Sequence, residues 1–151
     1  MSKNTTPITT LLAKKGPNVF STSPEKSVSD AVCEMNRQRV GCLVVLENDQ
    51  LVGIFTERDV LTRVVAEAKD ARETKVGDVM TPDPVILHAD DTVTTVMEIM
   101  TENRTRHLPV FDSDEKLIGL LSIGDLTRWQ MEENRAESDH LRQYVFGEYS
   151  A

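Results

Sequence analysis

A chain of 151 residues, 39% hydrophobic and 28% charged, has the size of one ordinary domain or of two small ones packed together. Its formal net charge of −8 argues against binding along a nucleic-acid backbone, because no broad cationic surface is expected. No apolar run approaches the roughly 18 residues of a membrane-spanning helix, and segment 1–15 lacks a secretory layout, so we expect a cytoplasmic protein with no membrane partner.

The first part of the chain predicts an extended segment and then a helix. Residues 19–22 have an extended pattern, and Ser27 with Asp30 three residues later fits the N-cap of a helix. Apolar residues then recur at the spacing of one helix face, at Val28, Ala31, Val32 and Met35. Cys33 and Cys42 have no His or Cys partner at metal-ligand spacing, so we expect two small buried hydrophobic residues and no metal site.

A hairpin and a second helix are expected next. Segments 42–46 and 51–55 are apolar and flank the polar turn 47–50, which predicts two antiparallel strands. A second helix should open at Asp59 and turn its apolar side chains inward, namely Val60, Leu61, Val64 and Val65. The charged residues 67–74 then predict a solvated connector.

The second half predicts the same order of elements. Segment 81–84, Thr-Pro-Asp-Pro, should enter it as extended chain, because proline disfavours helix in the residue before it. A helix capped by Thr92, strands at 108–111 and 117–121 and a helix from Asp125 follow. Each half is therefore strand, helix, strand, strand, helix.

The C-terminal segment predicts a long continuation of the last helix. Trp129 is expected in the core, and beyond it the chain is strongly charged with a sparse apolar stripe. Such a stripe packs either on the body of the protein or on a partner subunit. We divide the chain into a first unit at 18–70, a second unit at 75–130 and a C-terminal helical extension at 131–147.

The two halves are copies of one another. They align with offsets of 65 and then 66 residues, as in Val28 with Val93 and Gly53 with Gly119, and one extra residue lies near Glu115. Self-similarity of this kind indicates a unit that cannot bury its apolar face alone and packs against its copy. Each copy ends in glycine, two apolar residues, a hydroxyl residue, two variable positions and aspartate, as Gly-Ile-Phe-Thr-Glu-Arg-Asp at 53–59 and Gly-Leu-Leu-Ser-Ile-Gly-Asp at 119–125.

This signature has a structural and a functional explanation. Structurally, Thr56 or Ser122 caps a helix, and Asp59 or Asp125 in the first turn suits the helix dipole. Functionally, a helix N-terminus offers N–H groups to a phosphate. The aspartate can accept hydrogen bonds from both hydroxyls of a ribose, worth roughly 1.5 to 3 kcal/mol each.

Two such signatures, in register with a repeat of the whole unit, closely resemble a CBS-domain pair, also called a Bateman module. The resemblance covers about residues 18 to 130, including Val-Gly-Asp-Val-Met-Thr at 76–81 and Arg-His-Leu-Pro-Val at 106–110. Segments 123–125 and 141–147 are similar to the stand-alone pairs of bacteria and plant organelles. The resemblance implies an α+β fold, each unit β-α-β-β-α, with the two units packed about a pseudo-twofold axis that leaves two clefts.

In this family each cleft commonly takes an adenosine-containing ligand, such as AMP, ADP, ATP, a dinucleotide such as NAD(H), or S-adenosylmethionine. Carried over residue by residue, the first cleft would combine Thr56 and Asp59 with Val85, Ile86, Arg106, His107 and Pro109. The second would combine Ser122 and Asp125 with Phe20, Ser21, Gly41 and Cys42.

The two clefts are not expected to be equal. Arg58, Arg106 and His107 can surround a phosphate in the first, whereas the matching positions of the second, Gly124, Gly41 and Cys42, carry no charge. We therefore predict that the first cleft is the tighter AMP site. The second would take a less charged part of a ligand or stay empty.

These implications lead to a binding module that senses adenine nucleotides, forms a homodimer through apolar helix faces and regulates a separate partner protein. The alternative is an interaction scaffold whose clefts bind no nucleotide. An enzyme is not expected, because no nucleophile lies beside a base and no carboxylate pair or metal constellation appears beyond the ribose aspartates. No catalytic cofactor is implied.

Overall fold

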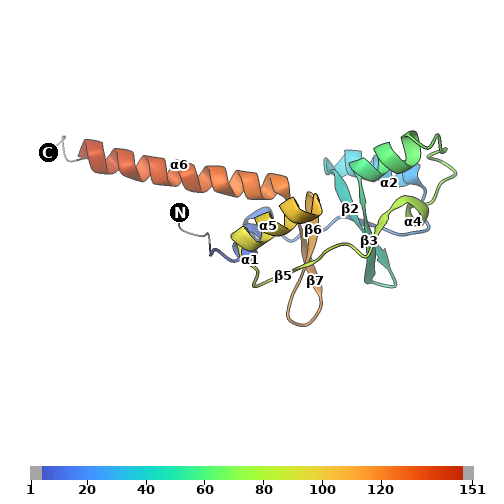
Figure 1. The fold of residues 1–151 in the computed structure, drawn as a ribbon, viewed down its shortest axis with the longest axis horizontal. Coiled ribbons are helices and arrows are strands. Elements are labelled where there is room, and N and C mark those ends of the chain that lie inside the picture. Colours follow the sequence, from blue (N-terminus) through green and yellow to red (C-terminus); the bar gives the residue numbers. More distant parts are fainter. Residues whose placement is uncertain (1–4, 148–151) are drawn as a thin grey trace.

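Two copies of one order of elements run along the chain, as the repeat predicts. A computed structural model describes residues 5–147 (Figure 1). Its elements are α1 (Ile8–Lys15), β1 (Ser21–Thr22), α2 (Val28–Gln38), β2 (Cys42–Glu47), β3 (Gln50–Thr56), α3 (Glu57–Asp59), the π-helical η1 (Val60–Val65), α4 (Val76–Val79), β4 (Thr81–Pro82), β5 (Leu87–His88), α5 (Val93–Asn103), β6 (His107–Phe111), β7 (Leu117–Ser122) and α6 (Ile123–Gly147).

Each copy builds a small sheet. The first has the order β1-β2-β3-β4, with β1 parallel to β2 and the other pairs antiparallel. The second has the order β5-β6-β7, with the same parallel first pair and antiparallel hairpin. The β2–β3 hairpin closes through Asn48 and Asp49, whose φ values of 51° and 61° are those of a two-residue turn matched to strand twist. The two sheets lie next to each other in Figure 1.

Helix caps place the helices as the sequence predicts. The Ser27 hydroxyl accepts a hydrogen bond from the Asp30 N–H at 3.0 Å and opens α2, and Thr92 opens α5 in the same way. Each helix buries one apolar face against its own sheet. The core of the first unit includes Val28, Ala31, Met35, Leu43 and Phe55, and that of the second includes Val93, Val96, Met100, Leu108 and Leu121.

Each core is completed by a helix that precedes the other unit. Ile8 and Leu11 of α1 are buried in the core of the second unit, although α1 comes before the first. Val76 and Val79 of α4 are buried in the core of the first unit. Matching backbone bonds fix both helices, from the Ile8 N–H to the Asp91 carbonyl at 2.9 Å and from the Val76 N–H to the Lys26 carbonyl at 2.8 Å. This exchange of helices was not predicted from the sequence.

The signature glycines make room for these exchanged helices. A Cβ atom at Gly53 would lie 2.6 Å from the Thr81 carbonyl oxygen and 2.8 Å from the Met80 sulfur, just after α4. A Cβ atom at Gly119 would lie 2.7 Å from a methyl carbon of Leu12 in α1. A side chain at residue 53 would therefore clash with backbone, whereas one at residue 119 would require the Leu12 side chain to move.

Three expectations about the first unit and its flanks are wrong. Leu61 and Val65 of η1 are 63% and 64% exposed, and Val64 is the buried side chain of that helix. Cys33 is exposed on α2, whereas Cys42 is buried as predicted. The extended entry at 81–84 is interrupted at Asp83, whose φ is 44°.

The last helix leaves the body of the molecule. Leu126 and Trp129 of α6 are buried in the core of the second unit, as expected for Trp129. Residues 131–145 are all exposed, and α6 projects away from both sheets (Figure 1). The expected apolar stripe thus does not pack on the body within the described residues, and its packing on a partner stays a prediction. Between residues 5 and 147, no helix combines the length and apolarity needed to cross a bilayer.

Candidate functional site

A cleft of about 310 Å³ lies where the two units meet. Its lining comes from the signature and helix start of the first unit, from β4 and from the end of α5 and start of β6 in the second. The lining residues are Gly41, Ile54, Thr56, Glu57, Arg58, Asp59, Thr62, Arg63, Thr81, Asn103, Arg104, Thr105, Arg106 and His107. Six of the predicted site residues are therefore brought together here.

A capping box fixes the signature aspartate in this cleft. The Thr56 hydroxyl accepts a hydrogen bond from the Asp59 N–H at 3.2 Å, and Asp59 Oδ2 accepts one from the Thr56 N–H at 3.0 Å. The reciprocal pair satisfies two donors at the helix start. Asp59 is only 4% exposed, so its carboxylate is held in one place beside the cleft.

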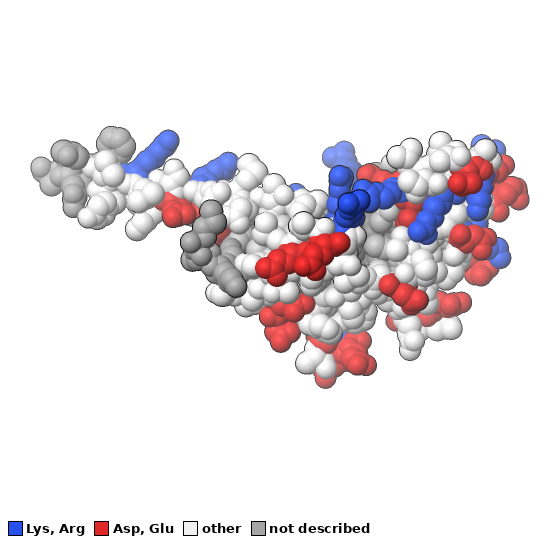
Figure 2. Space-filling view, in the orientation of Figure 1, with Lys and Arg blue, Asp and Glu red and all other residues white. Residues whose placement is uncertain are grey.

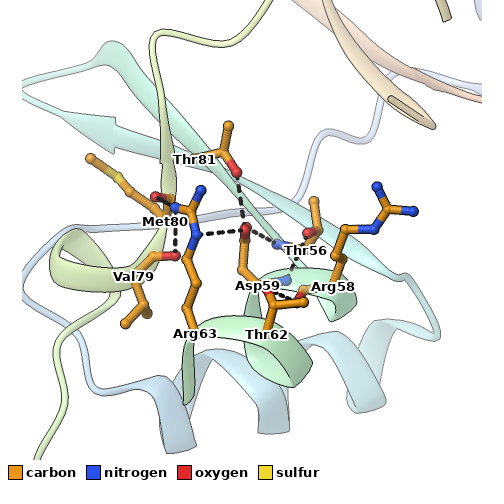
Figure 3. A network of polar contacts seen from close by, with 8 residues as sticks. All are labelled: Thr56, Arg58, Asp59, Thr62, Arg63, Val79, Met80 and Thr81. Carbon is orange, nitrogen blue, oxygen red and sulfur yellow. Dashed lines mark hydrogen bonds and ion pairs between the residues drawn. The ribbon is translucent and has the colours of Figure 1, made fainter. Parts of the chain in front are cut away.

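The other oxygen of Asp59 is also engaged (Figure 3). The Thr81 hydroxyl of β4 donates to Oδ1 at 3.0 Å, and Arg63 Nε lies 3.9 Å from the same oxygen. Arg63 also donates to the carbonyls of Val79 and Met80, which ties η1 to the chain after α4. Because a carboxylate offers about four acceptor positions, Asp59 keeps capacity for further donors.

Three guanidinium groups surround the cleft without a carboxylate partner among residues 5–147. Arg58 donates from Nη1 to the Arg104 carbonyl at 3.4 Å, a contact that crosses from the first unit to the second. Arg104 ends α5 with a left-handed φ of 51°, and Arg106 precedes β6. Figure 2 shows basic side chains gathered where the two halves meet, near α5.

The helix start is less open to a phosphate than the sequence suggests. The Glu57 N–H donates to the Gly41 carbonyl at 3.1 Å, and the Asp59 N–H is bonded to Thr56. Two of the first three N–H groups are therefore already satisfied. An anion in this cleft would rely on the arginine side chains more than on the helix N-terminus.

His107 is half-buried at the edge of the cleft. Burial lowers its pKa, and the nearby Lys15 charge lowers it further, while Glu57 and Asp125 act in the opposite direction with a smaller effect. The pKa of His107 therefore lies below its ordinary value of about 6.5. At neutral pH the imidazole is neutral and able to accept a proton.

The second signature has the same capping geometry, but its aspartate is bonded to a lysine and not to a threonine hydroxyl. Asp125 Oδ2 accepts from the Ser122 N–H at 2.8 Å, and the Ser122 hydroxyl accepts from the Asp125 N–H at 3.1 Å. Lys15 of α1 donates to Asp125 Oδ2 at 2.8 Å and to the Leu120 carbonyl at 2.6 Å. The cavity beside Asp125 measures about 90 Å³, and α1 and α6 alone line it.

Of the other predicted site residues, one lies in a different cleft from the one expected, and seven line neither of these two cavities. Gly41, expected in the second cleft, lines the first instead, because its carbonyl holds the start of α3. The others are Phe20 and Ser122, both half-buried, Ser21, Val85 and Ile86, all exposed, and Cys42 and Pro109, both buried. Burial, reinforced by the Asp59 charge, raises the pKa of the Cys42 thiol to about 12, so this thiol is chemically inert near neutral pH.

Sequence reasoning missed several residues that the fold brings to these sites. Thr81 ends the Val76–Thr81 motif and Arg63 follows Asp59 by one helical turn, so both carried a weak signal. Lys15 carried none, because α1 lies outside the repeat. Among residues 5–147, no group of three or more His, Cys, Asp or Glu side chains is placed to hold a metal ion.

Both halves of the chain match a known protein family. The CBS domain family model matches residues 15–66 and 76–132. The chain is 39% identical over 130 residues to the mitochondrial CBS domain-containing protein CBSX3 of Arabidopsis thaliana; the match covers 83% of this chain and spans 63% of that relative's length.

Two solved structures share the arrangement of both units. A CBS-domain containing protein from Agrobacterium tumefaciens has a TM-score of 0.78 at 33% identity, covering 83% of this chain and 99% of that one. A CBS domain protein from Pyrobaculum aerophilum, complexed with AMP, has a TM-score of 0.70 at 28% identity, covering 79% of this chain and 88% of that one. With both repeats matched and the fold shared, this chain belongs to the CBS-domain family, as a tandem pair of CBS domains.

Proposed function

We propose that the chain is a regulatory module that binds AMP, ADP or ATP in the cleft at Asp59 and thereby alters a separate partner protein. The observation that carries this proposal is the convergence, in one cleft of about 310 Å³, of a buried carboxylate and three guanidinium groups from both units that have no carboxylate partner among residues 5–147. A nucleotide has the complementary chemistry, because its ribose donates hydrogen bonds and its phosphate accepts them.

In the proposed complex the ribose hydroxyls donate to Asp59, and the phosphate lies among Arg58, Arg104 and Arg106. Charge-assisted hydrogen bonds of this kind contribute roughly 1.5 to 3 kcal/mol each. The adenine ring is expected to extend beyond the lining of the cleft toward Val85 and Ile86, which are exposed apolar residues of the segment between β4 and β5. The AMP complex of the Pyrobaculum protein supports an adenosine ligand.

The cleft chemistry also ranks the adenosine ligands. S-adenosylmethionine has no phosphate and a positively charged sulfonium, which is poorly suited to a cleft lined by four arginines. NAD(H) has two phosphates and needs room for a second nucleoside. We therefore place the mononucleotides first, with NAD(H) and S-adenosylmethionine as competitors in the same titration.

Regulation follows if the ligand binds one arrangement of the two units better than another. Arg58 and Arg104 belong to different units and are in contact across the cleft, so a phosphate between them would couple the units. We propose no catalytic role, and location in the cytoplasm stays a prediction, since one relative is mitochondrial.

A matched pair of arginine variants tests the ligand site. Arg39 and Arg104 occupy equivalent positions, each ending its helix with a left-handed φ, of 57° and 51°, but only Arg104 lines the cleft. Their alanine variants should lose similar stability. By calorimetry we expect Arg104→Ala to weaken AMP binding about tenfold, the effect of losing one such bond, and Arg39→Ala to leave it unchanged.

The aspartates provide the second arm of this test. Asp59→Ala should abolish AMP binding, whereas Asp125→Ala should leave it nearly intact; equal losses would contradict the assignment of the tighter site. A thermal-shift screen tests the scaffold alternative, because a ligand at 100 times its Kd adds about 2.7 kcal/mol of apparent stability. No stabilisation by any adenosine compound would favour the scaffold.

We also propose that two copies associate through apolar helix faces. Leu61 and Val65 of η1 and Met97 of α5 are 63%, 64% and 47% exposed, which is unusual for such side chains on helices packed against a core. Sedimentation velocity should show a dimer that Leu61→Glu dissociates. A separate variant, Met131→Glu at a 59% exposed position of α6, tests whether the apolar stripe of that helix also packs on a partner. A monomeric parent protein would contradict the proposal.

A further inference from the structure

The ammonium group of Lys15 lies on the carboxylate that the repeat places in the second cleft. Its Nζ atom donates to Asp125 Oδ2 at 2.8 Å and to the Leu120 carbonyl at 2.6 Å. The two partners belong to β7 and the start of α6, whereas Lys15 is the last residue of α1. The lysine side chain is 31% exposed and that of Asp125 only 10%, so the carboxylate is largely shielded from water while the ammonium group stays partly exposed.

In the first cleft, the position of this lysine is taken by a threonine hydroxyl. In both units a segment from outside the unit, either α1 or the chain that follows α4, supplies a donor to the signature aspartate. In the first unit the chain leaves α4 at Val79, forms β4 and presents the neutral hydroxyl of Thr81 to Asp59 at 3.0 Å. In the second unit α1 continues for twice as many residues and ends on a charged donor, Lys15.

The ion pair puts a charged donor on the carboxylate that a ribose would contact, where Asp59 has the neutral hydroxyl of Thr81. Asp125 Oδ2 already accepts from the Ser122 N–H and from Lys15, and Arg128 Nη1 lies 3.8 Å from Oδ1. A ribose binding here would have to displace the ammonium group, leaving a partly buried charge with only the Leu120 carbonyl. Burial alone would raise the pKa of Asp125, but hydrogen bonds from Lys15 and Ser122 outweigh it and hold that pKa below its ordinary value.

The cavity beside Asp125 is also smaller than a nucleotide site. The cavity there is about 90 Å³ and is lined by residues of α1 and α6, with none from the first unit. Ligand sites of nucleotide size usually measure about 300 Å³ or more. The cleft at Asp59 meets that size at about 310 Å³ and has lining from both units.

We propose that Lys15 is a built-in occupant of the second cleft, so that each chain binds one adenosine ligand, at Asp59, and gains a second, at Asp125, when the lysine side chain is removed. This inference rests on the proposed function for the identity of the ligand. It assigns to Lys15 the role of determining how many nucleotides the chain takes.

Calorimetric titration with AMP tests the proposal through stoichiometry. The parent chain should bind one equivalent and Lys15→Ala two, and Lys15→Ala/Asp125→Ala should return to one. Lys14→Ala is the matched control, because Lys14 is the preceding residue of the same helix and pairs with the exposed Glu132 at 3.4 Å and not with the Asp125 carboxylate. It should bind one equivalent, as the parent does. Lys15→Ser repeats the test should the alanine variant fold poorly, and circular dichroism checks both.

The outcomes separate this inference from the proposed function. One equivalent in both the parent and Lys15→Ala would overturn the inference and keep the nucleotide site at Asp59. Two equivalents in the parent would overturn it as well. No binding to the parent, with one equivalent gained in Lys15→Ala and lost again with Asp125→Ala, would support the role of Lys15 and refute the site at Asp59. No binding by any variant would overturn both.

Discussion

Asp59 and Asp125 stand at equivalent positions of the repeat, yet their neighbours give them different chemistry. Both are held by a reciprocal bond with a hydroxyl residue three positions earlier. Asp59 also receives a neutral hydroxyl, and Asp125 an ammonium group. The same residue type is thus a ligand acceptor in one unit and half of an ion pair in the other, because the decisive partner lies outside the repeat.

His107 should make nucleotide binding depend on pH. Its pKa is held below the ordinary value by burial and by Lys15, with Glu57, Asp125 and Arg106 as the other charged neighbours. A bound phosphate would raise that pKa, so the imidazole takes up a proton on binding, and binding is favoured as the pH falls through the pKa that His107 has in the complex. We expect the affinity of the parent chain relative to His107→Gln to rise several-fold between about pH 7.5 and about pH 6.

The relevant measurement is AMP calorimetry on both proteins at each pH. Their ratio removes the titration of the AMP phosphate itself, near pH 6, which affects both alike. A ratio that stays constant would show that His107 does not face the phosphate.

The two thiols should differ sharply in reactivity. Cys33 is exposed, whereas Cys42 is buried with its pKa raised to about 12, and the thiolate is the reactive form. A disulfide reagent should therefore label one thiol quickly in the native chain. Cys33→Ser should remove that reaction, and urea should restore a reacting thiol; two fast thiols in the native chain would contradict the burial of Cys42.

At the scale of elements, the start of the helix after β3 links stability to the ligand site. Thr56→Ala removes one arm of the capping box and with it the constraint on Asp59. Ser27→Ala removes the equivalent hydroxyl cap of α2, whose residues do not line the cleft. Each should cost about 1 kcal/mol of unfolding free energy, measured in urea. Only Thr56→Ala should also weaken AMP binding, and an equal effect of both on affinity would contradict the positioning role.

Elements with local signals are the ones that the sequence predicts well. The caps at Ser27 and Thr92 and the turn at Asn48–Asp49 depend on residues a few positions apart, and the structure has all of them. The inward face predicted for η1 failed at Leu61 and Val65, because the periodicity of apolar residues alone does not say which of them the core covers.

For the candidate site, the duplication placed one cleft at Asp59 and suggested a second at Asp125. The convergence of Arg58, Arg106 and His107 on the first was predicted, because each lies close to a repeat feature. The pairing of Lys15 with Asp125 was not, since it joins residues 110 positions apart and α1 repeats nothing else in the chain. Contacts of that range become visible only in the fold.

At the scale of the whole molecule, neither unit has a complete core from its own residues. Ile8 is fully buried in the second unit, so Ile8→Ala should destabilise the chain by about 2 to 5 kcal/mol. Ile86→Ala, at a 38% exposed position between the units, is the control and should cost less than half as much. Thermal and urea unfolding would measure both; a small effect at Ile8 would show that α1 is not part of that core.

The exchange of helices also sets an order for folding on the ribosome. The first unit has all its core once residue 79 has been synthesised, since α4 supplies its last buried side chains. Helix α1 is synthesised before either unit, but it can pack only after Leu121 and Trp129 of its core have been synthesised. During translation we therefore expect the first unit to fold while α1 stays undocked. Folding then ends when α1 packs onto the core of the second unit.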